Sequence, residues 1–162
     1  MWRGLAIFLF GGVLGVGAGV ALGFLLFPFF FPPPPAMDVL SESEQTRTLA
    51  TGNFIHADPS DPLHHGKGGV TVYERTVFLE RDFEVGPGPK YHVYLVPKAE
   101  VRESADVEGS MFVDLGRLRA FKGSQKYLLP AGIDIADYRS LVIWCEHFGV
   151  LISPADLKKE PG

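Results

Sequence analysis

An uncharged, apolar segment near the N-terminus limits the structures open to this chain more than any other part of its sequence. Residues 5–27 are only Leu, Ala, Ile, Phe, Val and Gly. As a helix with a rise of about 1.5 Å per residue, this segment spans the roughly 30 Å hydrocarbon core of a bilayer. We therefore predict a single-pass transmembrane helix, with residues 1–31 forming an N-terminal membrane anchor.

The charges that flank this segment indicate its orientation. Arg3 and the α-amino group precede the helix. The stretch that follows carries one basic residue, Arg47, against the acidic residues Asp38, Glu42 and Glu44. Because positive residues stay on the cytoplasmic side, we expect a cytoplasmic N-terminus and a periplasmic (extracytoplasmic) domain at the inner (cytoplasmic) membrane.

A cleaved signal peptide is the alternative to an anchor. The apolar run exceeds a signal-peptide core of roughly 7–15 residues, and no small-x-small cleavage site separates it from Pro32. The sequence favours an uncleaved anchor followed by four prolines at 32–35, a stiff polyproline spacer that rises about 3.1 Å per residue. We assign residues 32–48 to this spacer and a polar linker.

Glycines in the predicted helix recur at every fourth residue: Gly11, Gly15, Gly19 and Gly23. Residues four apart share one helix face, so they form a narrow strip almost free of side chains. Such strips allow close packing between membrane helices, although glycine is common in membrane helices generally. We predict that this side packs against membrane-protein helices of a larger complex, with a bound lipid or pigment as the alternative.

The charged residues lie almost entirely after the spacer. All 19 acidic residues and all but one of the 15 basic residues are found there. An acidic domain without a basic cluster is a poor nucleic-acid binder, so we predict no nucleic-acid partner. Short apolar runs bounded by Gly- and Pro-containing turns fill this part of the chain. They favour an antiparallel sandwich or barrel over residues 49–157, followed by a tail of residues 158–162.

Residues 138–148 contain the only cysteine and predict an inner strand, because their β-branched and aromatic side chains alternate between two largely apolar faces. One face carries Leu141, Ile143, Cys145 and His147, and the other carries Val142, Trp144 and Glu146. One cysteine excludes an intramolecular disulfide, a Cys-x-x-Cys pair and a multi-cysteine zinc site. The thiol is a buried packing residue, a single ligand of haem or metal, or a reactive redox group.

Several segments occur in a distinctive order. They are Gly-Val-Thr-Val after a His-Gly pair (residues 65–72), Leu-Glu-x-x-Phe (79–83), Gly-Pro-Lys-Tyr-x-Val-Tyr-Leu (88–95), Leu-Gly-x-Leu with Gly-x-Gln-x-Tyr-x-Leu-Pro (115–130), Tyr-x-Ser-Leu-Val-Ile-Trp-Cys-x-x-Phe (138–148) and Ala-x-Leu (155–157). In this order they resemble the DM-thirteen domain family over nearly the whole domain.

The resemblance implies a β-sandwich related to DOMON-type cytochrome domains. The predicted fold is therefore all-β, an antiparallel β-sandwich ectodomain preceded by one transmembrane α-helix. The resemblance also implies electron transfer through the cysteine, here Cys145, as a bare thiol or as a ligand of a prosthetic group such as haem. In two respects the match is incomplete, since Ser153 and Pro154 replace the usual Phe-Gly and no second axial ligand can be carried over.

The residues around Cys145 offer little support for a thiolate, since Glu146 is acidic and the strand is apolar. His147 is the one local group that could assist, although consecutive residues on one strand face lie about 6.5–7 Å apart. The other histidines lack recognised ligand spacing, so no metal site is predicted: His56, His64, His65 and His92. Single carboxylates are expected in turns and at the surface: Asp58, Asp61 and Asp114.

Two functions remain. In the first, a non-catalytic, membrane-anchored accessory subunit docks through its glycine-faced helix and its β-sandwich onto a membrane electron-transfer complex, respiratory or photosynthetic, and stabilises it. In the second, the domain transfers electrons itself through Cys145, as a redox thiol or as a haem or metal ligand. We favour the first because the helix is explicit in the residues. No enzyme activity is expected and no cofactor is firmly predicted, with haem as the one possibility.

Overall fold

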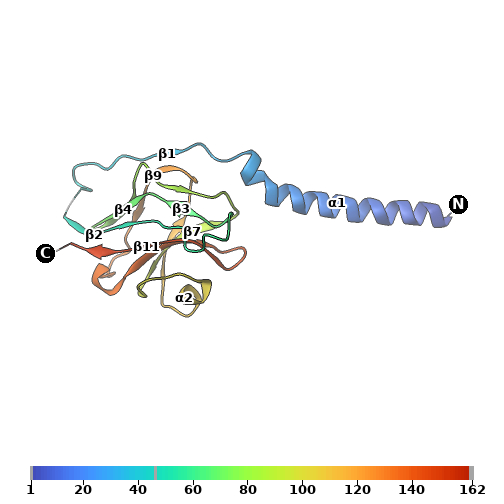
Figure 1. Cartoon of the computed structure of the whole chain (residues 1–162). Helices are drawn as coiled ribbons and strands as arrows, with labels where there is room; N and C mark the ends of the chain where they lie inside the picture. The colour runs from blue at the N-terminus through green and yellow to red at the C-terminus, as the bar shows by residue number, and fades with distance from the viewer. Residues whose placement is uncertain (1, 46, 161–162) are drawn as a thin grey trace. The chain divides into compact units, whose positions relative to one another are not determined.

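The computed structural model describes residues 2–45 and 47–160, and the chain divides into two units, residues 1–32 and residues 33–162. The first unit contains helix α1 (Trp2–Phe30) (Figure 1). No residue of α1 is buried, and the helix is long and apolar enough to cross a membrane. The apolar helix predicted from the sequence is therefore present, and it is a candidate membrane anchor or signal sequence.

The second unit consists mainly of strands in sheets. The largest sheet has the order β1 (Ala36–Met37), β9 (Gly123–Leu128), β5 (Thr76–Leu79), β4 (Gly69–Tyr73), β2 (Thr48–Asn53) and β12 (Lys158–Lys159). The second sheet has the order β11 (Val150–Asp156), β10 (Ser140–Cys145), β7 (Tyr91–Val96) and β8 (Val113–Arg117). A small sheet pairs β3 (Gly66–Lys67) with β6 (Glu84–Val85).

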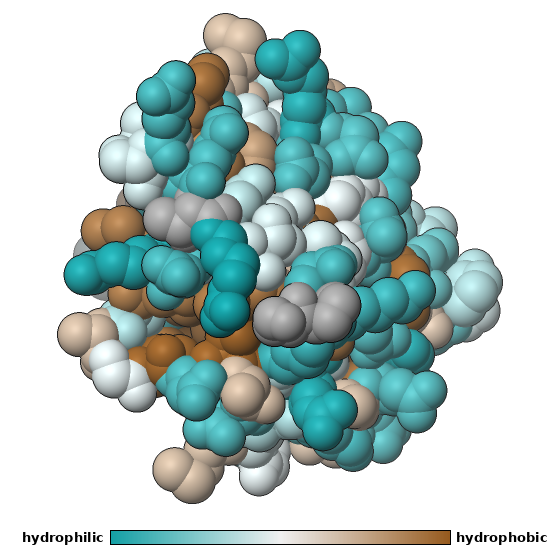
Figure 2. All heavy atoms as spheres, turned by 90° about the vertical axis from the view of Figure 1, so that its left-hand side faces the viewer, coloured by the Kyte–Doolittle hydropathy of each residue, from teal (hydrophilic) through white to brown (hydrophobic). Residues whose placement is uncertain are grey.

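The two larger sheets are arranged like a sandwich around one main core. Val72 and Leu79 from the first sheet belong to the same buried cluster as Val93 and Ile143 from the second. On the other face of the second sheet, the short helix α2 (Ser104–Glu108) supplies Val107 to a smaller cluster. The surface of the domain seen in Figure 2 is mostly hydrophilic, with small hydrophobic areas between the polar side chains.

One strand pair departs from the antiparallel arrangement that the sequence predicts. β1 lies in the expected linker and pairs in parallel with β9, with Ala36 opposite Gly123. Gly123 has a φ of +87°, and a Cβ there would collide with the Ala36 carbonyl group. A glycine is therefore required where the linker joins the sheet.

Strand β10 is the inner strand that the sequence predicts, and all six of its residues are buried. Leu141, Ile143 and Cys145 lie in the main core, whereas Val142 and Trp144 lie in the smaller cluster. The expected extension to His147 is wrong, because the strand ends at Cys145. Residues 146–149 turn the chain back, with Gly149 at a φ of +62° and its N–H donating to the Cys145 carbonyl.

Strand β11 explains how Ser153 and Pro154 fit where the resemblance leads us to expect Phe-Gly. Proline has no backbone N–H, and β11 lies at the edge of its sheet, where that loss is tolerated. The Pro154 carbonyl still accepts a hydrogen bond from the Ile55 N–H at 2.9 Å. Ser153 is fully buried and donates its hydroxyl to the Ile55 carbonyl at 2.8 Å.

Gln125 on β9 ties the preceding loop to the core. Its side chain is fully buried, and its Oε1 accepts hydrogen bonds from the N–H groups of Arg119 and Ala120 and from the Tyr127 hydroxyl. Its Nε2 donates to the Ala120 carbonyl at 2.9 Å. One side chain thus provides partners for backbone groups that have no strand partner at this point.

Replacing Gln125 with Ala should lower the free energy of unfolding by about 2–3 kcal/mol, because buried donors lose their acceptor. Urea unfolding of the detergent-solubilised chain, followed by tryptophan fluorescence, measures the change. Leu128→Ala on the same strand is the control, since Leu128 is 73% exposed and its loss should change stability by no more than about 0.5 kcal/mol. Equal effects of the two substitutions would contradict this account of Gln125.

Candidate functional site

Cys145 ends β10 with its side chain inside the main core. It is 1% exposed, and its Sγ donates a hydrogen bond to the Pro89 carbonyl at 3.2 Å. Tyr91, its partner across the sheet, is also buried. A Cβ at Gly88 would collide with the Tyr91 hydroxyl, so the 86–89 turn lies directly against that ring. The turn, Tyr91 and the core together enclose the thiol.

This environment suits a packed thiol and does not fit a haem held by Cys145. A sulfur that binds haem iron needs open space beside it for the porphyrin, whereas this sulfur is packed and hydrogen-bonded within the core. Burial raises the pKa of the neighbouring Tyr91 hydroxyl well above its usual range. Any ligand of Cys145 would have to displace the 86–89 turn.

His147 is not brought next to Cys145. It lies in the turn after β10, is exposed, and packs its ring edge to face against Phe148, with centroids 4.7 Å apart. In helix α1, a Cβ placed on Gly11, Gly15, Gly19 or Gly23 meets no atom within 4 Å. The glycine strip is therefore open, and its role and that of His147 stay predictions.

Two histidines of the 56–65 loop, His56 and His64, contact Asp61. Its carboxylate accepts hydrogen bonds from the Leu63 and His64 N–H groups at 2.8 and 3.2 Å and also pairs with the His64 ring. The Asp61 carbonyl contacts His56 Nε2 at 2.7 Å, and the His56 ring packs against His65. Asp61 is therefore a turn residue, as the sequence predicts.

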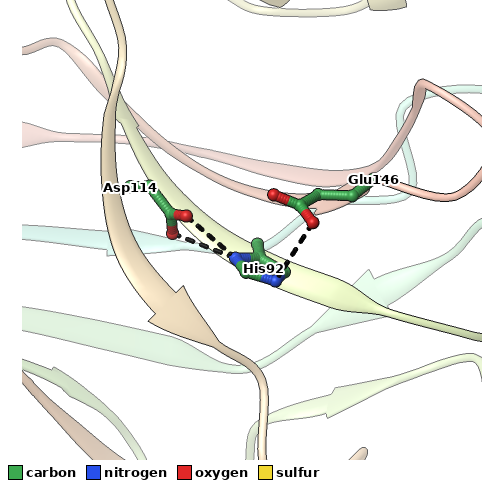
Figure 3. A group of neighbouring side chains, drawn as sticks. All are labelled: His92, Asp114 and Glu146. Atoms are coloured by element: carbon green, nitrogen blue, oxygen red, sulfur yellow. Dashed lines mark hydrogen bonds and ion pairs between the residues drawn. The ribbon is translucent and has the colours of Figure 1, made fainter.

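A cluster that the sequence did not reveal lies on the outer face of the second sheet, away from the main core. It contains His92 on β7, Asp114 on β8 and Glu146 just after β10, and Figure 3 shows the three side chains pointing toward one another. One ligand atom from each lies within 4.8 Å of the others. Among the described residues, it is the one such group of three His, Cys, Asp or Glu side chains, and Cys145 is not part of it.

A β-bulge on β8 helps to position Asp114. The register shifts between Val93 and Tyr94, so Asp114 lies opposite Tyr94 and Gly116 opposite Val93, with Leu115 as the extra residue. Gly116 has a φ of +117°, and its N–H donates to Asp114 Oδ1 at 2.7 Å. Bulges commonly redirect a side chain, and this one fixes the Asp114 carboxylate beside His92.

Glu146 is fixed by two further side chains. Lys90 Nζ lies 2.8 Å from Glu146 Oε2, and the Tyr94 hydroxyl donates to Glu146 Oε1 at 3.1 Å. The Lys90 ammonium is the main reason that the pKa of the Glu146 carboxyl lies below its usual range. Burial, followed by the Glu146 hydrogen bond, raises the pKa of the Tyr94 hydroxyl. Glu146 is therefore an oriented, ionised carboxylate.

Aromatic rings form the floor beside this cluster. Tyr94 stacks on Phe112 with centroids 4.2 Å apart and on Trp144 at 6.4 Å. Tyr94 and Trp144 are 3% and 7% exposed, so the polar cluster adjoins a dry, apolar surface. Such surroundings strengthen the electrostatic interactions at their edge.

Part of this cluster could have been found by sequence alone. Alternation along a strand puts His92 and Tyr94 on one face, and the predicted strand put Trp144 and Glu146 on one face. What joins these faces is the pairing of β10 with β7 and of β7 with β8, together with the bulge at Leu115. No local pattern in the sequence specifies those pairings.

These observations define the protein as a domain of sandwich-like sheets that follows an apolar helix. A family model described as electron transfer DM13 matches residues 59–157. The chain belongs to this family, which confirms the resemblance seen in the sequence and supports a role related to electron transfer. Comparisons with curated proteins and with solved structures gave no match.

Cys145 should react with a maleimide about 100-fold more slowly than an exposed cysteine, because labelling requires the enclosing turn to open. The control is His147→Cys in a Cys145→Ala background, which places a thiol two residues away on the surface. Mass spectrometry of the intact chain over time gives both rates. Comparable rates would show that the thiol is accessible in the folded protein.

The 58–64 loop should loosen in acid. The Leu63 N–H, followed by His64, lowers the pKa of the Asp61 carboxyl to about 2 from its ordinary 3.8. Because the folded pKa is depressed, the ionised group stabilises the loop above about pH 4, and this contribution is lost as the pH falls through about 2. NMR chemical shifts of the Leu63 amide should change in that window, and Asp61→Asn should abolish the titration. An amide shift that titrates equally in both proteins would contradict the assignment.

Proposed function

We propose that this chain is a non-catalytic accessory subunit of a membrane electron-transfer complex, respiratory or photosynthetic. In this proposal α1 spans the inner membrane with its N-terminus in the cytoplasm, and the sheet domain lies on the periplasmic side. The glycine side of α1 packs against a helix of the complex, and the domain stabilises that complex. The observation that carries the proposal is the four-residue spacing of Gly11, Gly15, Gly19 and Gly23 along a helix that has no buried residue of its own.

The composition of α1 supports a partner within the membrane. A helix that serves only as an anchor gains nothing from glycine, which weakens helices by about 1 kcal/mol relative to alanine. Lipid chains fill a glycine groove poorly, whereas a second helix can approach it closely and gain van der Waals contact. The strip at Gly11, Gly15, Gly19 and Gly23 is thus better explained by helix packing than by anchoring alone.

The position of Cys145 supports an accessory role over a role as electron carrier. A thiol that exchanges electrons with a partner must be reached by it, and Cys145 is 1% exposed and donates to a backbone carbonyl. Family membership supports electron transfer as the setting. An accessory subunit satisfies both observations, because it belongs to the electron-transfer assembly without carrying the electron.

Gly15→Leu should release the chain from its complex, whereas Gly17→Leu should not. Successive residues differ by about 100° around a helix, so Gly17 lies about 200° from Gly15, on the far side of the strip. The two variants make the same substitution at nearly the same depth. Both should be expressed as full chains in the native membrane, solubilised in mild detergent and compared by co-purification and native electrophoresis. We expect at least a tenfold loss of co-purifying protein for Gly15→Leu only.

Equal retention of both variants would reject the helix contact, and equal loss would point to a general membrane defect. Cys145→Ser separates the accessory role from the carrier role. We expect this variant to assemble normally and the complex to keep its electron-transfer rate. Normal assembly with a lost rate would instead identify Cys145 as the carrier.

A further inference from the structure

The outer-face cluster has the chemistry of a metal site. We propose that His92, Asp114 and Glu146 bind a first-row divalent cation of the Zn²⁺ class. One imidazole and two carboxylates from neighbouring segments each offer a ligand atom within 4.8 Å of the others, and Figure 3 shows both carboxylates directed toward the His92 ring. Three protein ligands leave coordination positions open for water or a further ligand.

The distances suit such an ion after small side-chain adjustments. Asp114 Oδ2 lies 3.0 Å from His92 Nδ1 and Glu146 Oε2 lies 3.4 Å from His92 Nε2, so the carboxylates flank the ring and an ion takes one of its two nitrogens. Ligands that bind Zn²⁺ at about 2.0–2.2 Å are separated from one another by about 3.4 Å in a tetrahedral site. All three ligand atoms are already within 4.8 Å of one another, so a change of side-chain torsions is sufficient.

Both carboxylates are oriented before any ion arrives. The Gly116 N–H holds Asp114 Oδ1, and the Tyr94 hydroxyl holds Glu146 Oε1. In each case a second oxygen remains directed toward His92. Metal-binding carboxylates are typically supported by such hydrogen bonds, which reduce the entropy lost on binding. Of these two hydrogen-bond donors, Gly116 belongs to the bulge on β8 and Tyr94 belongs to the aromatic floor.

The two carboxylates beside His92 also favour a cation there. A neutral imidazole donates from one nitrogen only, yet each nitrogen of His92 faces a carboxylate. One of these contacts is therefore unfavourable unless the ring is protonated or a cation occupies one side. An ion bound at one nitrogen removes the contact that lacks a proton.

Lys90 supplies the positive charge when no ion is present. Its ammonium lies 2.8 Å from Glu146 Oε2, and its side chain is 56% exposed, so it can swing into water. An incoming ion must compete with this ammonium for Glu146. Lys90 therefore lowers the affinity of the site for a metal ion.

Zinc binding to the detergent-solubilised full chain tests the proposal. Isothermal titration with ZnCl₂ should give a site whose affinity falls at least about tenfold in Asp114→Asn and in Glu146→Gln, which keep the shape of the side chain. Lys90→Met should raise the affinity severalfold, because the competing ammonium is gone. His147→Ala, which removes an exposed histidine outside the cluster, should bind as the parent does.

Other readouts make each outcome decisive. Co²⁺ should give a visible absorption band that His92→Ala abolishes, and Ca²⁺ should bind far more weakly than Zn²⁺, because imidazole is a poor calcium ligand. Circular dichroism of each metal-free variant must match the parent; where one does not, the remaining carboxylate variant and Lys90→Met decide. Equal Ca²⁺ and Zn²⁺ affinities, or zinc binding insensitive to all three cluster residues and to Lys90, would overturn the proposal. Neither result depends on the proposed accessory role.

Discussion

The burial of β10 on both of its faces is the interaction on which the rest of the domain depends. Leu141, Ile143 and Cys145 enter the main core, and Val142 and Trp144 enter the smaller cluster. Each large apolar side chain buried in this way contributes about 1.5–3 kcal/mol. A slip of one residue would exchange the two faces, so the strand has one acceptable register between β7 and β11.

This register decides which chemistry is inside the domain and which is outside. Cys145 ends the strand facing the main core, whereas the next residue, Glu146, leaves it on the outer face beside His92. The two groups are neighbours in sequence but are separated by the sheet itself. A thiol enclosed by the core and a carboxylate open to ions are therefore consequences of the same strand.

The sequence predicts what alternation and turn residues can specify. It predicted the apolar helix, the inner strand and the two faces at Leu141 and Val142, because these depend on neighbouring residues. It failed at His147, where Gly149 closes a turn, and at β1, whose pairing with β9 joins residues far apart in the chain. The outer cluster depends on two strand pairings and a bulge, and no single stretch of sequence carries that information.

Access to the partner decides where a member of an electron transfer family can exchange charge. A redox centre needs access to its partner, and the enclosed Cys145 offers little of it. The outer face has the half-buried His92, the exposed Asp114 and the ionised, half-buried Glu146. Stacked rings extend beside them from Trp144 through Tyr94 to the partly exposed Phe112. If charge or a cation is handled by this domain itself, the physical chemistry favours this outer face over the thiol.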